Sequence, residues 1–139
     1  MKKYRIIISG AGGRDFNNYL VYFKDSPAFE VVAFTAAQIP GIEKRKFPKE
    51  LTYGKRDIPT YPEYKLQELI RKLKIDYVFL SYSDLPHQYV MEFASKVLAA
   101  GANFSLLGTN DTYIKSKKPV ISVTAVRTGS GKSQTSRAI

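Results

Sequence analysis

Residues 4–15 read YRIIISGAGGRD, and this stretch decides the fold that the sequence predicts. The short β-branched run at 4–9 is typical of a strand buried on both faces of a sheet. Glycines follow it, and the apolar residues after them recur at helical spacing, which predicts a helix over about 14–24. A strand, a glycine turn and a helix in this order form the first unit of a Rossmann-type fold, whose turn presents backbone N–H groups to an anion.

The same alternation of strands and helices continues along the chain. Apolar runs at 30–35, 76–81 and 102–107 predict further strands, and apolar stripes at 66–73 and 90–98 predict helices. Residues 57–61 contain Pro59 and predict a short edge strand, where proline is tolerated. The expected class is α/β, with a Rossmann-like, doubly wound parallel sheet of about five strands. We assign residues 1–116 to this nucleotide- or ligand-binding domain.

Ligands of such sheets bind outside the carboxyl ends of the strands. This rule gives a set of candidate ligand-binding residues around the first turn and its neighbours: Gly10, Ala11, Gly12, Gly13, Arg14, Asp15, Thr35, Ser81 and Ser83. The dinucleotide fingerprint is incomplete in two places. Asp15 stands in place of the third glycine, and the second strand ends near Thr35, where the fingerprint has an acidic residue. NAD is therefore not supported. A phosphate- or CoA-like ligand and a tight turn without a ligand remain as alternatives.

A second glycine motif lies near the C-terminus. The apolar run at 119–124 predicts a strand, and the residues after the motif predict the start of a helix. Strand, glycine loop, Lys-Ser and helix form the layout of a phosphate-binding P-loop, in which Lys132 reaches the β- and γ-phosphates as the catalytic residue and Ser133 ligates Mg²⁺. The residues expected to bind the nucleotide phosphates are Thr128, Gly129, Ser130, Gly131, Lys132 and Ser133.

This second motif is imperfect and stands close to the end of the sequence. Val126 occupies a position where the usual pattern has glycine, and six residues follow Ser133. A P-loop NTPase needs further strands after the loop, including one that bears a Mg²⁺-binding Asp. We therefore assign 117–139 to the first strand and P-loop of an incomplete, truncated second domain. One alternative is a Gly/Ser-rich loop or frayed tail that matches the pattern by chance. Another is that Val120–Thr124 joins the Rossmann sheet as an extra edge strand and leaves the Lys132 loop unsupported.

The composition narrows the class of protein. The chain has 44% hydrophobic residues, no cysteine and a formal net charge of +10. No apolar stretch approaches the roughly 18 residues that span a membrane, so no membrane partner and a cytoplasmic location are expected. The positive charge suits a small, anionic, phosphorylated substrate. Nucleic acid is a weaker alternative because no helix-turn-helix, zinc-finger or RNA-binding signature occurs. A homo-oligomer stays open.

These motifs resemble the N-terminal part of the archaeal cyclic 2,3-diphosphoglycerate synthetase family and its GTPase-like relatives. The resemblance rests on residues 10–16, 31–42, 82–84 and 116–137. It implies an ATP-dependent ligase that closes an intramolecular phosphoanhydride, with ATP or GTP and Mg²⁺ held by Gly129, Gly131, Lys132 and Ser133. It also implies that this chain alone is inactive. The alternatives are a non-catalytic Rossmann module that binds a nucleotide, CoA or a phosphorylated metabolite, and a part of a GTPase-like protein.

Overall fold

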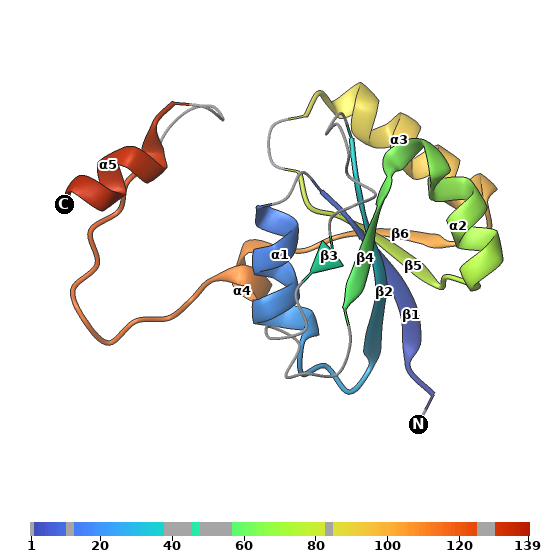
Figure 1. The fold of residues 1–139 in the computed structure, drawn as a ribbon, viewed down its shortest axis with the longest axis horizontal. Coiled ribbons are helices and arrows are strands. Elements are labelled where there is room, and N and C mark those ends of the chain that lie inside the picture. The colour runs from blue at the N-terminus through green and yellow to red at the C-terminus, as the bar shows by residue number, and fades with distance from the viewer. Residues whose placement is uncertain (1, 11–12, 38–45, 48–56, 83–84, 125–129) are drawn as a thin grey trace.

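The computed structural model describes residues 2–10, 13–37, 46–47, 57–82, 85–124 and 130–139. In this part of the chain, one six-stranded sheet has the order β3-β4-β2-β1-β5-β6 (Figure 1). The five strands from β4 to β6 pair in parallel, and β3 pairs antiparallel with β4. The predicted α/β, Rossmann-like sheet is therefore confirmed. The strands are β1 (Tyr4–Ser9), β2 (Phe29–Ala36), β3 (Lys46–Phe47), β4 (Ile58–Pro62), β5 (Tyr77–Leu80) and β6 (Asn103–Leu106).

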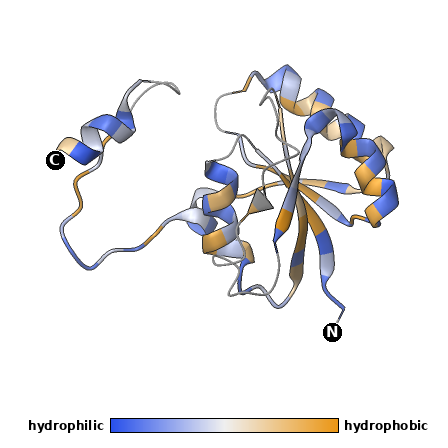
Figure 2. Ribbon diagram, viewed as in Figure 1, coloured by the Kyte–Doolittle hydropathy of each residue, from blue (hydrophilic) through white to orange (hydrophobic). Residues whose placement is uncertain are grey.

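Helices cover both faces of the sheet. On one face lie α2 and α3, and on the other lies α1 with the π-helical turn that continues it (Figure 1). Hydrophilic and hydrophobic residues alternate along α2 and α3, as Figure 2 shows, which fits helices with one face toward the sheet and one toward solvent. The helices are α1 (Arg14–Asn18), the π-helical turn Tyr19–Phe23, a 3₁₀ turn Glu63–Lys65, α2 (Leu66–Leu73), α3 (His87–Ala99), α4 (Thr109–Thr112) and α5 (Lys132–Ala138).

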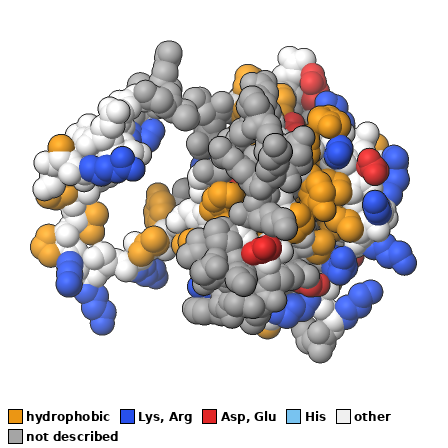
Figure 3. All heavy atoms as spheres, viewed as in Figure 1, with side chains coloured by type: hydrophobic (Ala, Val, Ile, Leu, Met, Phe, Trp, Pro, Cys, Tyr) orange, Lys and Arg blue, Asp and Glu red, His pale blue; other side chains and the backbone are white. Residues whose placement is uncertain are grey.

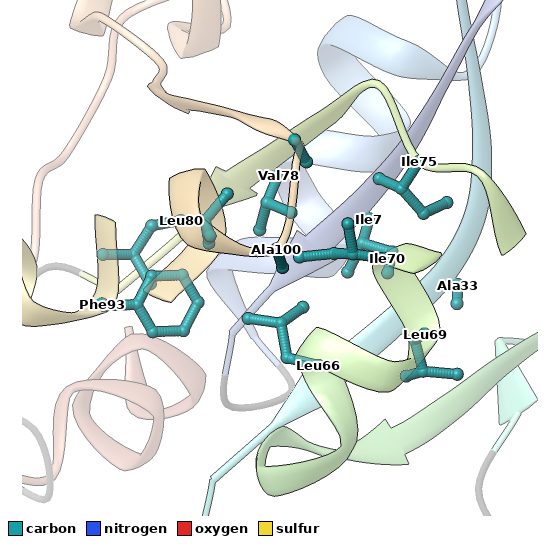
Figure 4. Packing of buried hydrophobic residues seen from close by; sticks show 12 residues of the cluster. Ile7, Ala33, Leu66, Leu69, Ile70, Ile75, Val78, Leu80, Phe93 and Ala100 are labelled. Atoms are coloured by element: carbon teal, nitrogen blue, oxygen red, sulfur yellow. The ribbon is translucent and has the colours of Figure 1, made fainter. Parts of the chain in front are cut away.

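Two apolar cores fill the spaces between the sheet and its helices. The core beneath α2 and α3 includes Ile7, Val78 and Phe93, which pack together in Figure 4. The core on the α1 side is rich in aromatic rings, and its centre is Phe34, which is fully buried. Successive residues of a strand point to opposite faces, so the apolar run of β1 supplies Ile6 and Ile8 to one core and Ile7 to the other.

A β-bulge interrupts the pairing of β1 with β2. Ile6 pairs with Val31, but Ile7 pairs with Ala33, so one extra residue, Val32, lies in β2. Val32 and Ala33 both pack toward the α2/α3 core although they are consecutive, and the faces alternate again from Phe34 onward.

The predicted single helix over 14–24 differs from the observed structure. Five α-helical residues are followed by a π-helical turn, in which the Lys24 amide donates to the Tyr19 carbonyl at 2.8 Å, five residues earlier. The wider turn keeps Tyr19 and Phe23 both buried against the aromatic core.

The C-terminal part also differs from the sequence-based expectation. Residues 119–124 form no strand and pair with nothing in the described sheet, and Val120 and Ile121 are exposed. Figure 1 shows this segment leading away from the sheet to α5, which stands apart from the other helices. Among the described residues, we find no helix that is both long enough and apolar enough to cross a membrane.

Candidate functional site: a polar rim at the carboxyl edge of the sheet

Buried polar side chains gather at the edge of the sheet where the parallel strands end. Four come from strands or the residue after a strand, and two come from α1; we call this set the polar rim. Strand order reverses between β1 and β5, which is the position where open α/β sheets bind ligands. The polar rim consists of Ser9, Asp15, Asn18, Thr35, Thr60 and Ser81, all of them at most 4% exposed.

The described part of the glycine turn is closed by its own side chain. The Asp15 carboxylate accepts a hydrogen bond from the Gly13 amide at 2.6 Å and is 1% exposed. A Cβ atom at Gly10 would lie 2.5 Å from the Asp15 Cβ, so only glycine allows this approach. In the dinucleotide fingerprint the third glycine gives close helix–strand packing; here Asp15 places a carboxylate there instead.

A second contact on the α1 side joins the helix to β5. The Asn18 Nδ2 donates to the Ser81 Oγ at 2.9 Å, and both side chains are buried. The pair ties α1 to the residue that follows β5, across the point where strand order reverses. This hydrogen bond therefore holds α1 against the end of β5, at the point where the strand order reverses.

Tyr82 crosses the rim on the α2/α3 side. Its hydroxyl donates to the Gly10 carbonyl and accepts from the Ala37 amide, each at 3.1 Å. These two backbone groups follow the ends of β1 and β2, so the phenol spans both strands. Burial raises the pKa of Tyr82, hydrogen bonding from the Ala37 amide lowers it, and the negative charges of Glu63 and Asp15 raise it further.

Glu63 and Tyr89 form the next contact on the same side. The Tyr89 hydroxyl donates to the Glu63 Oε1 at 2.5 Å. Burial is the largest cause of a raised pKa for Tyr89, and the hydrogen bond to Glu63 and its charge add to it. Tyr82, Tyr89 and Glu63 are therefore electrostatically linked at this side of the rim.

Several buried polar atoms of this region have no hydrogen-bond partner among the described residues. Each such atom has lost its water, and an unmade hydrogen bond in a buried place is costly, so unsatisfied atoms that gather at one edge point to a ligand or ordered water. They are the Ser9 Oγ, the Asn18 Oδ1, the Thr35 Oγ1, the Thr60 Oγ1 and the Glu63 Oε2.

The raised tyrosine pKa values predict a late step in an alkaline titration. A group whose pKa is higher in the folded state than its ordinary value near 10 stabilises the fold below about pH 10, and this contribution is lost as the pH rises through the folded pKa. Absorbance at 295 nm should therefore show a late-ionising fraction, which is the tyrosines that ionise at higher pH than the rest. This fraction should be absent from the double variant Tyr82→Phe/Tyr89→Phe. Tyr64→Phe, a change at a side chain that is 82% exposed, is the control and should leave the late-ionising fraction in place. Uniform ionisation of all tyrosines would contradict the prediction.

The structure places some of the predicted rim residues together. Gly10, Gly13, Asp15, Thr35 and Ser81 lie at the carboxyl edge, with Asp15, Thr35 and Ser81 buried. Arg14 begins α1 and is exposed. Ala11, Gly12 and Ser83 lie outside the described residues, and ligand binding by the whole set stays a prediction.

The C-terminal glycine motif is only partly described. Gly131 has a left-handed φ of 82° and precedes α5, which begins at Lys132, while Ser130 and Ser133 are exposed. Thr128 and Gly129 lie outside the described residues, so phosphate binding by this motif, the catalytic role of Lys132 and metal binding by Ser133 remain predictions. The described residues contain no group of three or more His, Asp or Glu side chains suited to a metal ion.

Sequence reasoning missed several rim residues. Ser9 is the last residue of β1, so the rule that ligands bind at strand ends could have found it. Asn18 and Thr60 sit in elements whose pattern gives no sign of a polar role, and the link between Glu63 and Tyr89 joins residues 26 positions apart. The hydrogen bonds of the Tyr82 and Tyr89 hydroxyl groups beside the rim were not predicted either.

Comparison with solved structures supports the fold. The chain is similar to RSP, described as a Rex-family repressor, with 21% identity, a TM-score of 0.56 and coverage of 79% of this chain and 55% of RSP. A crystal structure of RSP in complex with β-NADH gives 20% identity, a TM-score of 0.55 and coverage of 78% and 55%. At this identity the likeness concerns the fold alone. No known protein-family model matches the chain.

The comparisons overturn the expectations drawn from family resemblance. A curated relative at 52% identity is named arginine synthetase, so both the resemblance to cyclic 2,3-diphosphoglycerate synthetase and the predicted phosphoanhydride-forming ligase are wrong. The predicted ATP or GTP with Mg²⁺ is also wrong, because the nucleotide named for the solved neighbour is NADH. The resemblance had rested on glycine turns, which serve many ligands and do not identify a substrate.

The curated relative is much longer than this chain. It is arginine synthetase ArcE of Thermococcus kodakarensis, and the alignment with it is 140 positions long. The alignment covers 99% of this chain and 31% of the relative, so the chain spans about a third of the length of the curated relative it matches. The name of that relative is of the ligase type.

Proposed function

We propose that this chain is the Rossmann-like part of an enzyme that forms arginine, and that the polar rim holds a ligand of that enzyme. The observation that carries the proposal is the identity of 52% across 99% of the chain with a protein named arginine synthetase. The position of the rim, at the reversal of strand order, supports a role in ligand binding. Cytoplasm is the location that fits such an enzyme.

The glycine turn argues against a dinucleotide held in the usual way. In that arrangement the pyrophosphate lies over the first turn at the N-terminus of the helix. Here the buried Asp15 carboxylate accepts the Gly13 amide, so the turn offers a negative charge and one fewer free N–H group to an anion. On the face shown in Figure 3, the Lys and Arg side chains of the described residues are not gathered into a single patch.

The proposal also divides the chain into two units. Residues 1–116 would form the ligand-binding domain, and 117–139 would belong to a separate unit. The exposure of Val120 and Ile121 supports this division, because an apolar run that finds no partner strand in the Rossmann-like sheet is free to pair elsewhere.

A chimera tests the proposed function. In the T. kodakarensis arginine synthetase, the matching 31% of the protein is replaced by this chain, and arginine formation is measured by amino-acid analysis under the conditions that suit the parent. We expect arginine production within about tenfold of the parent, a loss of at most about 1.4 kcal/mol in transition-state stabilisation.

The control separates fold from function. A second chimera carries the Rossmann-like domain of RSP, which shares the fold at 21% identity, and is expected to form no arginine. If the first chimera folds, as judged by circular dichroism and its melting temperature, and forms no more arginine than the second, the proposed function is wrong.

A further inference from the structure

Glu63 is a carboxylate with one oxygen that has no hydrogen-bond partner among the described residues. One oxygen accepts the Tyr89 hydroxyl, and the other, Oε2, is buried and has no partner among the described residues. A carboxylate removed from water without a cation or a full set of donors is costly. A ligand that offers N–H groups and a positive charge would satisfy this oxygen.

Two hydroxyl groups without partners lie on the same side of the sheet. Ser9 and Thr35 are neighbours across β1 and β2, and both are fully buried. Their strand neighbours Ile8 and Phe34 point into the α1-side core, so alternation directs Ser9 and Thr35 toward α2 and α3. Adjacent strands are about 4.8 Å apart, so the two hydroxyls lie within the span of one guanidinium group.

Tyr82 connects these two features. Its hydroxyl contacts the Gly10 carbonyl and the Ala37 amide, close to the ends of β1 and β2 where Ser9 and Thr35 stand. Pro62 pairs with Ala36 at the end of β2, so Glu63, the next residue, follows the same strand ends. Glu63, Ser9, Thr35 and Tyr82 therefore form one cluster, here called the acceptor cluster.

The charge of this region favours a cation. Glu63 and Asp15 both act on Tyr82 as negative charges. The ion pair between Arg5 and Glu30, at 3.6 Å, lies at the amino ends of β1 and β2, away from the rim. A planar guanidinium carries five N–H donors in a fork that matches a carboxylate through two parallel bonds.

We infer that the acceptor cluster binds the guanidinium group of L-arginine, with the Glu63 carboxylate as its counter-charge and the Ser9 and Thr35 hydroxyls as further acceptors. The inference rests on the proposed function, because it takes arginine as the ligand from the name of the relative. It adds the location of the guanidinium subsite and the residues that form it. Tyr82 and Tyr89 act as positioning residues. Tyr82 holds the ends of β1 and β2 together, and Tyr89 orients the Glu63 carboxylate.

Isothermal titration of this chain with L-arginine tests the inference, with L-norleucine as the ligand that lacks a cation. We expect arginine to bind and norleucine not to bind. Glu63→Gln keeps an acceptor for Tyr89 but removes the charge, and should weaken arginine binding about ten- to hundredfold, since hydrogen bonds to charged groups are the strong ones. Glu68→Gln, an exposed change of the same kind on α2, should leave the affinity unchanged.

Thr35→Val is the second variant, because it tests the site without a loss of charge. If Thr35 only fills space, the melting temperature rises and arginine affinity stays the same. If its hydroxyl accepts from the ligand, the melting temperature rises and affinity falls several-fold. The inference is overturned if the unchanged chain does not bind arginine at millimolar concentration, or if Glu63→Gln and Thr35→Val both bind it as the unchanged chain does. An active chimera together with either result would leave the proposed function standing.

Discussion

Replacing Gly10 with alanine is expected to lower the free energy of unfolding by about 3 kcal/mol, because overpacking a closed site forces backbone and side chains apart. The added Cβ would lie 2.5 Å from the Asp15 Cβ and 2.8 Å from its Cγ. Asp15 has nowhere to move, since it is 1% exposed and held by the Gly13 amide. Urea denaturation followed by far-ultraviolet circular dichroism measures the change.

Gly13→Ala is the matched control for this prediction. A Cβ at Gly13 would meet nothing within 4 Å, and its φ of −157° is outside the left-handed region that favours glycine. Its effect should therefore stay within about 0.5 kcal/mol. The double variant Gly10→Ala/Asp15→Gly removes the atoms that clash and should recover part of the loss. Equal stability of the Gly10 and Gly13 variants would show that the close approach is absent.

Replacing Phe34 with alanine is expected to cost about 3–5 kcal/mol, the range for removing a large side chain from a packed core. Phe34 is fully buried in the centre of the sheet. Its ring centroid lies 5.1 Å from that of Phe16, 6.0 Å from Tyr19 and 5.5 Å from Phe47, so the change removes contacts from three rings at once. The shift of the urea midpoint at constant slope gives the value.

A surface aromatic residue provides the comparison for Phe34. Tyr113 is 68% exposed, and Tyr113→Ala should change stability by no more than about 0.5 kcal/mol. Phe34→Leu, which leaves a smaller cavity, should fall between the two. The prediction is wrong if Phe34→Ala unfolds at the same urea concentration as Tyr113→Ala.

The sheet and its main helices were predictable because their signals are local. The apolar runs of β1 and β5 and the stripes on α2 and α3 each specify an element from its own residues, and the alternation of elements specifies the parallel order. The short strand β3 could not be predicted in this way. It has two residues, and its Phe47 is buried only because the aromatic core lies beside it.

The strand predicted at 119–124 shows the limit of the same signal. A β-branched run favours extended structure, but a strand is stable only when its backbone pairs with neighbours and one face is covered. In the described sheet, these residues find neither partner nor cover, and Ile121 is 75% exposed. The residues of this segment indicate a preference for extended structure, but they do not say which strand would pair with it.

The location of the candidate site was predictable from the sequence, but the hydrogen bonds within it were not. The strand-end rule located Asp15, Thr35 and Ser81 at one edge, and the structure places them there. Asp15 can close the glycine turn because α1 approaches β1 closely. That Glu63 meets Tyr89 depends on the packing of α3 beside the turn that starts α2. The contact between Glu63 and Tyr89 joins residues 26 positions apart, and no spacing in the sequence encodes it.

The β-bulge in β2 has a consequence for how this strand can change in length. With Val32 present, Thr35 stands beside Ser9 and Phe34 beside Ile8. Losing Val32 would remove the extra residue and leave regular alternation, with Ala33 still beside Ile7, Phe34 beside Ile8 and Thr35 beside Ser9. A descendant of this chain that is one residue shorter at the bulge should therefore keep the same cores and the same strand-end residues.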